Sequence, residues 1–147
     1  MAAGFTIKGD NLREFRKNLT VLAQNEVTEE SFGSVLDIEQ EISPTWLNKE
    51  SISFLNSLEP FGRGNPTPTF LSKGMSVLGA KNVGKDKTHL KLTLEKNDYV
   101  YDAIAFRQGQ SLSTARGIVD IAYTAGMNYW NGKETIQLTV QDFKRSD

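Results

Sequence analysis

The sequence of 147 residues contains no cysteine and a single histidine, His89. The absence of cysteine excludes disulfide bonds and thiolate metal sites, and it is compatible with a reducing compartment. One imidazole without convergent carboxylates is a weak metal ligand, and it completes neither a cysteine nor a serine nucleophile site. The sequence therefore predicts that this chain alone does no chemistry and holds no metal or other cofactor.

Long apolar runs are also missing. No stretch approaches the roughly 20 apolar residues that a membrane-spanning helix needs, and no basic segment followed by an apolar one marks a secretory signal at the N-terminus. Apolar residues make up 38% of the chain and charged residues 24%, which suits one globular domain, or a small domain with a remnant of another. We expect a cytoplasmic protein with no membrane partner.

The whole chain has almost no excess of either charge, since its net charge is −1, but its two parts carry opposite net charges. Residues 1–69 carry six Lys/Arg against ten Asp/Glu, a net of −4, whereas residues 70–147 carry eleven against eight, a net of +3. The second part is therefore the one that attracts a polyanion.

The first part has helical spacing. Apolar residues recur every three or four positions from Leu12 to Ala23, which predicts a helix over residues 11–25. Residues 35–42 alternate like a strand, and Ser43-Pro44 predicts the start of a second helix, with Ser43 as N-cap and an apolar stripe that continues to Leu58. A connector follows at residues 58–70, where three prolines and two glycines allow neither a helix nor a central strand to continue.

After the connector the apolar spacing falls to two. Five β-rich segments are predicted, at residues 70–81, 89–95, 99–107, 118–129 and 133–143, with a short helix or loop at 108–116. Five strands with an insert between the third and the fourth are the pattern of an OB-fold, although other small β-barrels share much of it. The spacing does not decide which face of the third strand points inward.

An OB-fold binds single strands on its second and third strands, beneath the loops that follow the first and the fourth strands. The predicted first loop and the adjoining strands supply cations, and the predicted last loop supplies aromatic rings. The candidate nucleic-acid-binding residues are Lys81, Lys85, Lys87, His89, Lys91, Arg107, Tyr129, Trp130 and Lys133. For the lysines the alternative is a solvated loop, and for the aromatic residues it is packing across the hairpin. Arg63, between Gly62 and Gly64, either contacts a phosphate or belongs to a hinge that fixes the angle between domains.

Three stretches of the sequence carry a family resemblance. They are Ala2-Ala3-Gly4-Phe5, the run Glu59-Pro60-Phe61-Gly62 with Gly64-Asn65-Pro66, Pro68 and Phe70, and the run from Asn128 to Gly132. Together they resemble the C-terminal part of the RecJ family of single-stranded-DNA-specific 5′→3′ exonucleases. In that family the Ala-Ala-Gly run follows a histidine motif of the DHH-associated domain, so the resemblance implies that the catalytic half lies outside this chain.

The resemblance implies an α+β fold, in which an N-terminal helical and β remnant precedes a five-stranded OB-fold β-barrel. We expect three regions: residues 1–34 as the C-terminal remnant of the DHH-associated domain, 35–69 as a strand-helix connector with a hinge, and 70–147 as the OB-fold. The implied cofactor is Mn²⁺ or Mg²⁺ in the catalytic core of the parent enzyme. The implied partners are single-stranded DNA, a single-strand-binding protein and the parent's catalytic domain. A different class of function, an OB-fold that docks a partner or an acidic peptide, stays open beside it.

Overall fold

The computed structural model describes residues 4, 6–26 and 35–146. The chain divides into two compact units, Met1–Leu36 and Asp37–Asp147. Among the described residues no helix is long and apolar enough to cross a membrane. Residues 37–69, predicted as a connector, belong to the same unit as the barrel, whereas the predicted boundary at residue 34 lies outside the described residues. The three-part division stays a prediction.

The first unit contains one α-helix. A 3-10 turn, η1 (Gly9–Asn11), leads into α1 (Leu12–Glu26), which confirms the predicted helix to within one residue at each end. None of the residues of α1 is buried, and its apolar residues Leu12, Leu19 and Leu22 are each about half exposed. Ahead of this turn, Thr6 and Ile7 form no strand.

The predicted strand at residues 35–42 is wrong in most of its length. Only β1 (Gln40–Glu41) forms, and it pairs in parallel with the start of β2 (Phe70–Val83) through Gln40 and Phe70. The partner strand begins only at Phe70, because Pro68 and Pro66 before it have no N–H to donate to a ladder. The backbone of Glu39 reaches it with one hydrogen bond, to the carbonyl of Thr69 at 2.9 Å.

The predicted helix start at Ser43 is also corrected. Pro44–Trp46 forms only a 3-10 turn, η2, and the Ser43 side chain caps nothing. The α-helix is α3 (Lys49–Ser57), and Asn48 is its N-cap: Asn48 Oδ1 accepts from the Ser51 N–H at 2.9 Å, while Ser51 Oγ accepts from the Asn48 N–H at 2.8 Å. This reciprocal capping box fixes the start of a helix too short to be stable alone.

The Pro/Gly connector closes into a turn. Gly62 and Asn65 exchange backbone hydrogen bonds of 2.8 and 3.1 Å, and the Asn65 side-chain amide donates to the carbonyls of Leu58 and Pro60. Gly62 and Gly64 do not adopt the left-handed backbone conformation that glycine permits, and a Cβ on either would meet no atom within 4 Å. The turn therefore depends on Asn65 and the prolines rather than on glycine's freedom.

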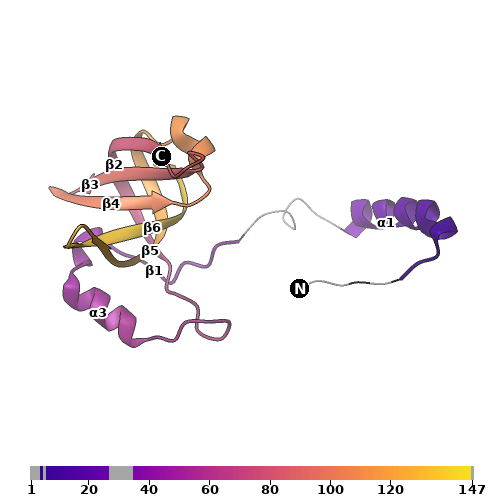
Figure 1. Ribbon diagram of the computed structural model, residues 1–147, viewed down its shortest axis with the longest axis horizontal. Helices are drawn as coiled ribbons and strands as arrows, with labels where there is room; N and C mark the ends of the chain where they lie inside the picture. Colours follow the sequence, from indigo (N-terminus) through magenta and orange to yellow (C-terminus); the bar gives the residue numbers. More distant parts are fainter. Residues whose placement is uncertain (1–3, 5, 27–34, 147) are drawn as a thin grey trace. The chain divides into compact units, whose positions relative to one another are not determined.

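The rest of the second unit is a closed barrel (Figure 1). After β2 come β3 (His89–Lys96), β4 (Tyr99–Ala105), the 3-10 turn η3 (Gly109–Ser113), β5 (Gly117–Trp130) and β6 (Lys133–Arg145). The sheet order is β1-β2-β3-β4-β6-β5, and pairing of β2 with β5 closes the ring. The β4–β6 pair is parallel and the other pairs of the ring are antiparallel. This order confirms the predicted five-stranded OB-fold.

The core explains why these strands hold together. Leu90, Leu92 and Leu94 on β3 are fully buried, as their alternation predicts. On β4 it is Tyr101, Ala103 and Ala105 that face inward, which settles the orientation that the sequence leaves open. Helix α3 lies below the barrel strands in Figure 1 and adds Ile52 and Leu55 to the same core.

Candidate nucleic-acid interface

The outward face of β3 and β4 carries cations in its centre. Strand register places Lys81 of β2 opposite Lys91 of β3, and Thr93 opposite Asp102 of β4. Like charges that face each other across a ladder are destabilising, and Lys91 compensates by pairing with Asp102, with Nζ 3.4 Å from Oδ1. The outward side of β2, β3 and β4 therefore holds Lys81 and Lys91 in adjacent rows, together with the carboxylates of Asp102 and Glu95.

One flank of this face is the hairpin end, residues 128–135, where β5 turns into β6. Asn131 and Gly132 both have positive φ, 48° and 73°, as a two-residue hairpin requires. Trp130 pairs with Lys133 across the turn, and its side chain is 73% exposed. A pocket of about 310 Å³ lies here, and its lining residues come from β3, β4, β5 and β6: Lys91, Asp102, Asn128, Trp130, Lys133 and Thr135.

Tyr129 lies on the opposite side of this hairpin, because successive strand residues alternate. Its hydroxyl donates to Glu134 Oε1 at 2.8 Å, and Lys49 of α3 donates to Glu134 Oε2 at 2.7 Å. The hydrogen bonds from Lys49 and Tyr129 lower the pKa of Glu134, and the bond to Glu134 raises the pKa of both Lys49 and Tyr129. The structure therefore does not bring Tyr129 together with Trp130, although its ring is 72% exposed.

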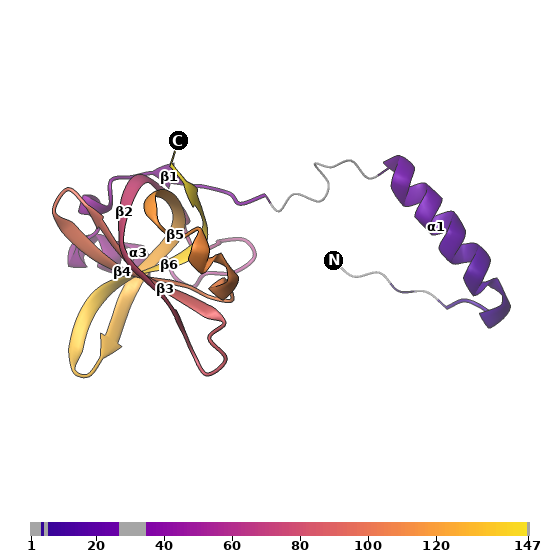
Figure 2. The same ribbon diagram turned by 90° about the horizontal axis from the view of Figure 1, so that it is seen from above.

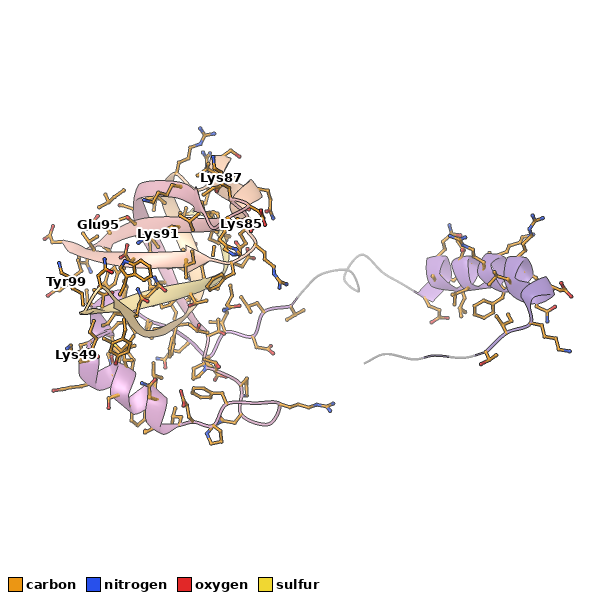
Figure 3. The ribbon with its side chains drawn as sticks, in the orientation of Figure 1. Lys49, Lys85, Lys87, Lys91, Glu95 and Tyr99 are labelled. Carbon is orange, nitrogen blue, oxygen red and sulfur yellow. The ribbon has the colours of Figure 1, made fainter. Side chains whose placement is uncertain are left out.

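The other flank is the loop end, which comprises the β2–β3 loop (residues 84–88) and the turn after β4 (residues 106–110). Lys85 and Lys87 lie on the loop, at the opposite end of β3 from Glu95 (Figure 3). Figure 2 shows this loop and the β5–β6 hairpin projecting from the same side of the barrel. The face between them is thus bordered by charge on one side and by an indole on the other.

His89 joins the two parts of the loop end. Its Nδ1 accepts a hydrogen bond of 3.0 Å from the backbone N–H of Arg107, which places the ring proton on Nε2. Its ring meets the edge of Phe106 at a centroid distance of 5.3 Å. A pocket of about 580 Å³ lies here, lined by Asn82, Lys87, Thr88, His89, Arg107, Gly109 and Gln110.

The structure therefore groups the predicted residues into two sets. Lys87, His89 and Arg107 meet at the loop end, whereas Lys91, Trp130 and Lys133 meet at the hairpin pocket. Lys85 lies on the loop beside the first set and Lys81 lies opposite Lys91. Neither pocket includes Arg63, which lies in the connector turn with Gly62 and Gly64.

Sequence reasoning missed three residues at the loop end, Phe106, Asn82 and Gln110. Phe106 is the first residue of the turn after β4 and is 55% exposed. Asn82 stands on the inward side of β2, next in alternation after Ala80, where a polar residue is unexpected. That interruption of the apolar alternation was visible in the sequence, whereas the position of Gln110 depends on how η3 packs.

A divalent metal centre needs several carboxylates or imidazoles directed at one point. In the part of the chain that the structure describes, no three His, Asp or Glu residues gather closely enough to hold a metal ion. These residues do not fit the Mn²⁺ or Mg²⁺ that the resemblance implies for the parent enzyme.

Comparison of the sequence with known proteins identifies one family. The RecJ OB domain matches residues 38–142. The single-stranded-DNA-specific exonuclease RecJ of Bacillus subtilis is 31% identical over 147 residues, covering 97% of this chain and 18% of that protein. RecJ of Haemophilus influenzae is 28% identical over 144 residues, covering 95% and 25%.

A solved structure agrees in fold. The crystal structure of RecJ from Thermus thermophilus in complex with Mn²⁺ superposes with a TM-score of 0.77 at 22% identity, covering 98% of this chain and 20% of that one. The chain thus spans about a fifth to a quarter of the length of these relatives. It belongs to the RecJ OB domain family, and over nearly its whole length it is homologous to the C-terminal region of RecJ exonucleases.

Proposed function

We propose that this chain is a single-stranded-DNA-binding region of a RecJ-type exonuclease. The observation that carries the proposal is the pocket at the hairpin end, where the cations of Lys91 and Lys133 lie beside the exposed indole of Trp130. A single strand presents phosphates and unstacked bases, and it is held by this combination of cations and flat rings. A duplex hides its bases, so the indole has no equivalent role there.

The strand would cross the outward face of β3 and β4, from the loop end to the hairpin end. Lys85, Lys87 and Arg107 supply cations at the first, and Lys81 and Lys91 continue the charge across the middle. A base stacked on Trp130 contributes on the order of 1–3 kcal/mol. Asp102 forms an ion pair with Lys91, and a phosphate would compete for that lysine.

In the parent enzyme this region would position the strand for the nuclease centre. That centre would use Mn²⁺ or Mg²⁺ to activate a water molecule for attack on a phosphodiester. The ligands for the metal would come from the catalytic domain, which is one of the partners that we propose for this region. A single-strand-binding protein is a further proposed partner, because it shares the strand.

The test is fluorescence anisotropy of a labelled single-stranded oligonucleotide titrated with the 147-residue chain at low and moderate salt. Trp130→Ala and the double variant Lys85→Glu/Lys87→Glu should each weaken binding at least several-fold. For a contact with n phosphates, the logarithm of affinity should fall with the logarithm of salt at a slope of about −0.7n.

Two control variants separate the site from bulk properties. Arg13→Glu/Lys17→Glu on α1 makes the same change in net charge as the loop variant, but on a helix of the first unit whose surface is exposed. Tyr99→Ala removes an aromatic ring that is 60% exposed and lies outside the hairpin pocket. Both controls should bind like the unmodified chain, and equal loss in all four variants would overturn the proposed site.

Absence of binding even at low salt would sink the proposal and favour the second class of function, docking of a partner or an acidic peptide. One feature is consistent with that class: Leu47, Tyr99, Val100 and Ile136 line a groove of about 680 Å³ between the segment that precedes α3 and the strands β4 and β6. An acidic peptide would be expected to displace a bound strand at the same lysines, which competition in the anisotropy assay measures.

A further inference from the structure

The charged residues that line the loop-end pocket are all basic. Of the described residues around it, Lys87, His89 and Arg107 are basic and none is a carboxylate. Neither Lys87 nor Arg107 forms an ion pair with a described residue. The hairpin pocket differs, because Asp102 lines it and pairs with Lys91. A cavity that gathers basic groups and no carboxylate suits an anion rather than a metal ion.

The backbone of both cationic residues is strained. Among the described residues, five that are not glycine have positive φ, and three of them are Asn or Asp, which tolerate that conformation. The other two are Lys87 (φ 53°) and Arg107 (φ 60°), which line the pocket from the β2–β3 loop and from the turn after β4. Such strain persists where the surrounding structure enforces it, and it is typical of ligand sites.

Close packing of the two segments enforces this strain. The N–H of Gly109 donates to the carbonyl of Thr88 at 2.8 Å, and a Cβ at position 109 would stand 2.6 Å from the Lys87 carbonyl oxygen. The turn after β4 therefore packs directly on the β2–β3 loop. The pocket is held by contacts within the protein that do not depend on a ligand.

His89 offers a fixed donor at this pocket. Its Nδ1 accepts a hydrogen bond of 3.0 Å from the Arg107 N–H, which only the neutral ring can accept and which leaves the ring proton on Nε2. The edge contact with Phe106 holds the ring on one side. At Gly84 a Cβ would stand 3.1 Å from His89 Cδ2, so a side chain there would crowd the ring. The orientation of the Nε2–H is therefore set by the protein.

This donor is accessible to a ligand. Among the described residues, the buried polar side-chain atoms without a hydrogen-bond partner are Asn82 Oδ1 and the Tyr101 hydroxyl. Nε2 of His89 donates to no described residue, yet it is not one of these buried atoms. Since His89 lines the pocket, an acceptor that enters the pocket can reach this N–H.

We infer that the loop-end pocket holds one backbone phosphate of the strand, with a hydrogen bond from Nε2 of the neutral His89 ring and charge from Lys87 and Arg107. This inference rests on the proposed function and adds a fixed point to it. Charge alone treats every phosphate alike, whereas a directional donor in a rigid pocket holds one phosphate in a defined place. The pocket of about 580 Å³ is larger than a phosphate group, so it admits the phosphate as part of a continuous chain.

The first experiment measures anisotropy of a labelled oligo(dT) with a variant that separates the two ring nitrogens. Asparagine places its carbonyl oxygen near the position of Nδ1 and reaches no further, so His89→Asn keeps an acceptor for the Arg107 N–H and loses the donor. The affinity should fall about 5- to 20-fold, as for a hydrogen bond to a charged group, while the unfolding temperature stays close to that of the unmodified chain. Because the lost donor is neutral, the salt slope should not change.

The complementary variant is His89→Gln. Glutamine places its amide nitrogen near the position of Nε2, so this variant keeps a donor and loses the acceptor for the Arg107 N–H. It should unfold at a lower temperature than His89→Asn and bind the strand more tightly. The reverse order of affinities would show that His89 acts only by holding the turn after β4, and it would overturn the phosphate site.

Two variants of the β2–β3 loop test whether the pocket or only the charge of the loop matters. Lys87→Gln removes a cation that lines the pocket, whereas Lys85→Gln removes a cation of the same loop that does not line it. The loss of affinity should be about 3-fold greater for Lys87→Gln, because only this lysine makes a charge-assisted hydrogen bond to the fixed phosphate. Equal losses would show that the loop acts by charge alone, which contradicts a defined site.

NMR of the imidazole nitrogens observes the contact directly, since His89 is the single histidine of the chain. In the free chain the nitrogen chemical shifts should be those of the neutral ring with its proton on Nε2, and a proton on Nδ1 would contradict the geometry. Addition of the strand, or of inorganic phosphate, should shift Nε2 more than Nδ1. A strand with uncharged methylphosphonate linkages should shift neither, because it lacks the anionic oxygens.

The outcomes separate the two proposals. Salt-sensitive binding of the strand with no change at Nε2, or with full affinity in His89→Asn, would overturn the phosphate site and leave the single-strand-binding function intact. A response of Nε2 to inorganic phosphate but not to the strand would mean that the strand does not enter the pocket, which also overturns the inference. No binding of any oligonucleotide would overturn both proposals.

Discussion

The two flanks of the β3–β4 face are built in different ways. At the loop end, two segments distant in sequence pack so closely that only glycine fits at position 109, and two cationic residues accept an unfavourable backbone conformation. At the hairpin end, a local two-residue turn defines the shape, and the contacts of Glu134 with Lys49 and Tyr129 lie on an exposed surface. The comparison teaches that steric fit fixes the first flank and local turn chemistry fixes the second.

The largest expected effect on the free energy of unfolding comes from Tyr123, in the core that both flanks share. This tyrosine is fully buried, its hydroxyl lies 2.9 Å from Ser72 Oγ, and burial raises its pKa from 10.0 to about 12. Because the folded state holds the proton more tightly, the stability that this group contributes is complete below the ordinary pKa of 10.0 and is lost as the pH rises toward about 12. The full loss is about 3 kcal/mol.

Urea unfolding over a series of pH values that brackets the ordinary tyrosine pKa measures this loss. Tyr123→Phe keeps the ring and removes the ionisable hydroxyl group. The free energy of unfolding of this variant should therefore fall less steeply over the same pH range. Identical slopes in the two proteins would mean that the alkaline loss comes from other groups, among them Tyr101, whose pKa burial also raises.

Gly109→Ala should be the most damaging change at the loop end. The new Cβ would stand 2.6 Å from the Lys87 carbonyl oxygen and 3.0 Å from that of Thr88, both of them backbone atoms. We expect a loss of about 2 kcal/mol in the free energy of unfolding, as for other overpacked sites. Gly126→Ala on β5, where a Cβ meets nothing within 4 Å, should cost little. Equal effects of the two alanines would contradict the steric account.

Gly132→Ala should do less harm at the hairpin end. Its Cβ would meet nothing within 4 Å, so the cost is only that of holding alanine at a φ of 73°, about 1 kcal/mol. Denaturant unfolding gives the size of the loss. The amide chemical shifts should change at residues 128–135 and stay constant at the loop end. Shifts that spread to residues 84–88 would show that the two flanks are coupled.

Glu134→Gln should have the smallest effect. The contacts of Glu134 lower its pKa, so the stabilisation they give is present above the usual value of 4.5 and is lost as the pH falls through the lowered one. On an exposed surface such pairs contribute little. We expect faster amide exchange at residues 128–135 in Glu134→Gln, and in the unmodified chain at low pH, whereas Glu50→Gln on α3 leaves exchange unchanged. No difference between the two variants would remove Glu134 as an anchor.

The sequence predicts the parts of the fold that depend on local spacing. The alternation of Leu90, Leu92 and Leu94 and the Asn131-Gly132 turn locate β3 and the last hairpin, and all five barrel strands lie where they are expected. The predictions of a strand at residues 35–42 and of an N-cap at Ser43 were wrong. The strand depends on where its partner β2 begins, and the cap depends on which side chain reaches the first turn of α3. Neither of these is visible from local spacing.

In the candidate site, too, some residues could be predicted from the sequence and others could not. The lysines and Trp130 could be proposed from the loops in which they stand. The bond from Lys49 to Glu134 joins residues 85 positions apart, and the pocket around Asn82 needs the η3 turn to fold against the β2–β3 loop. These contacts form only through tertiary packing, so no pattern of neighbouring residues in the sequence predicts them.

The closure of the barrel by β2 and β5 bears on how this chain folds. The two strands pair Phe70 with Tyr123 and Val77 with Gly117, so the ring closes across 40 to 53 residues. Contacts so distant in sequence slow the folding of β proteins. During synthesis on the ribosome, β2, β3 and β4 would form an open sheet, in which the edge of β2 stays unpaired until β5 emerges. That interval is when the nascent chain most needs protection from association with its neighbours.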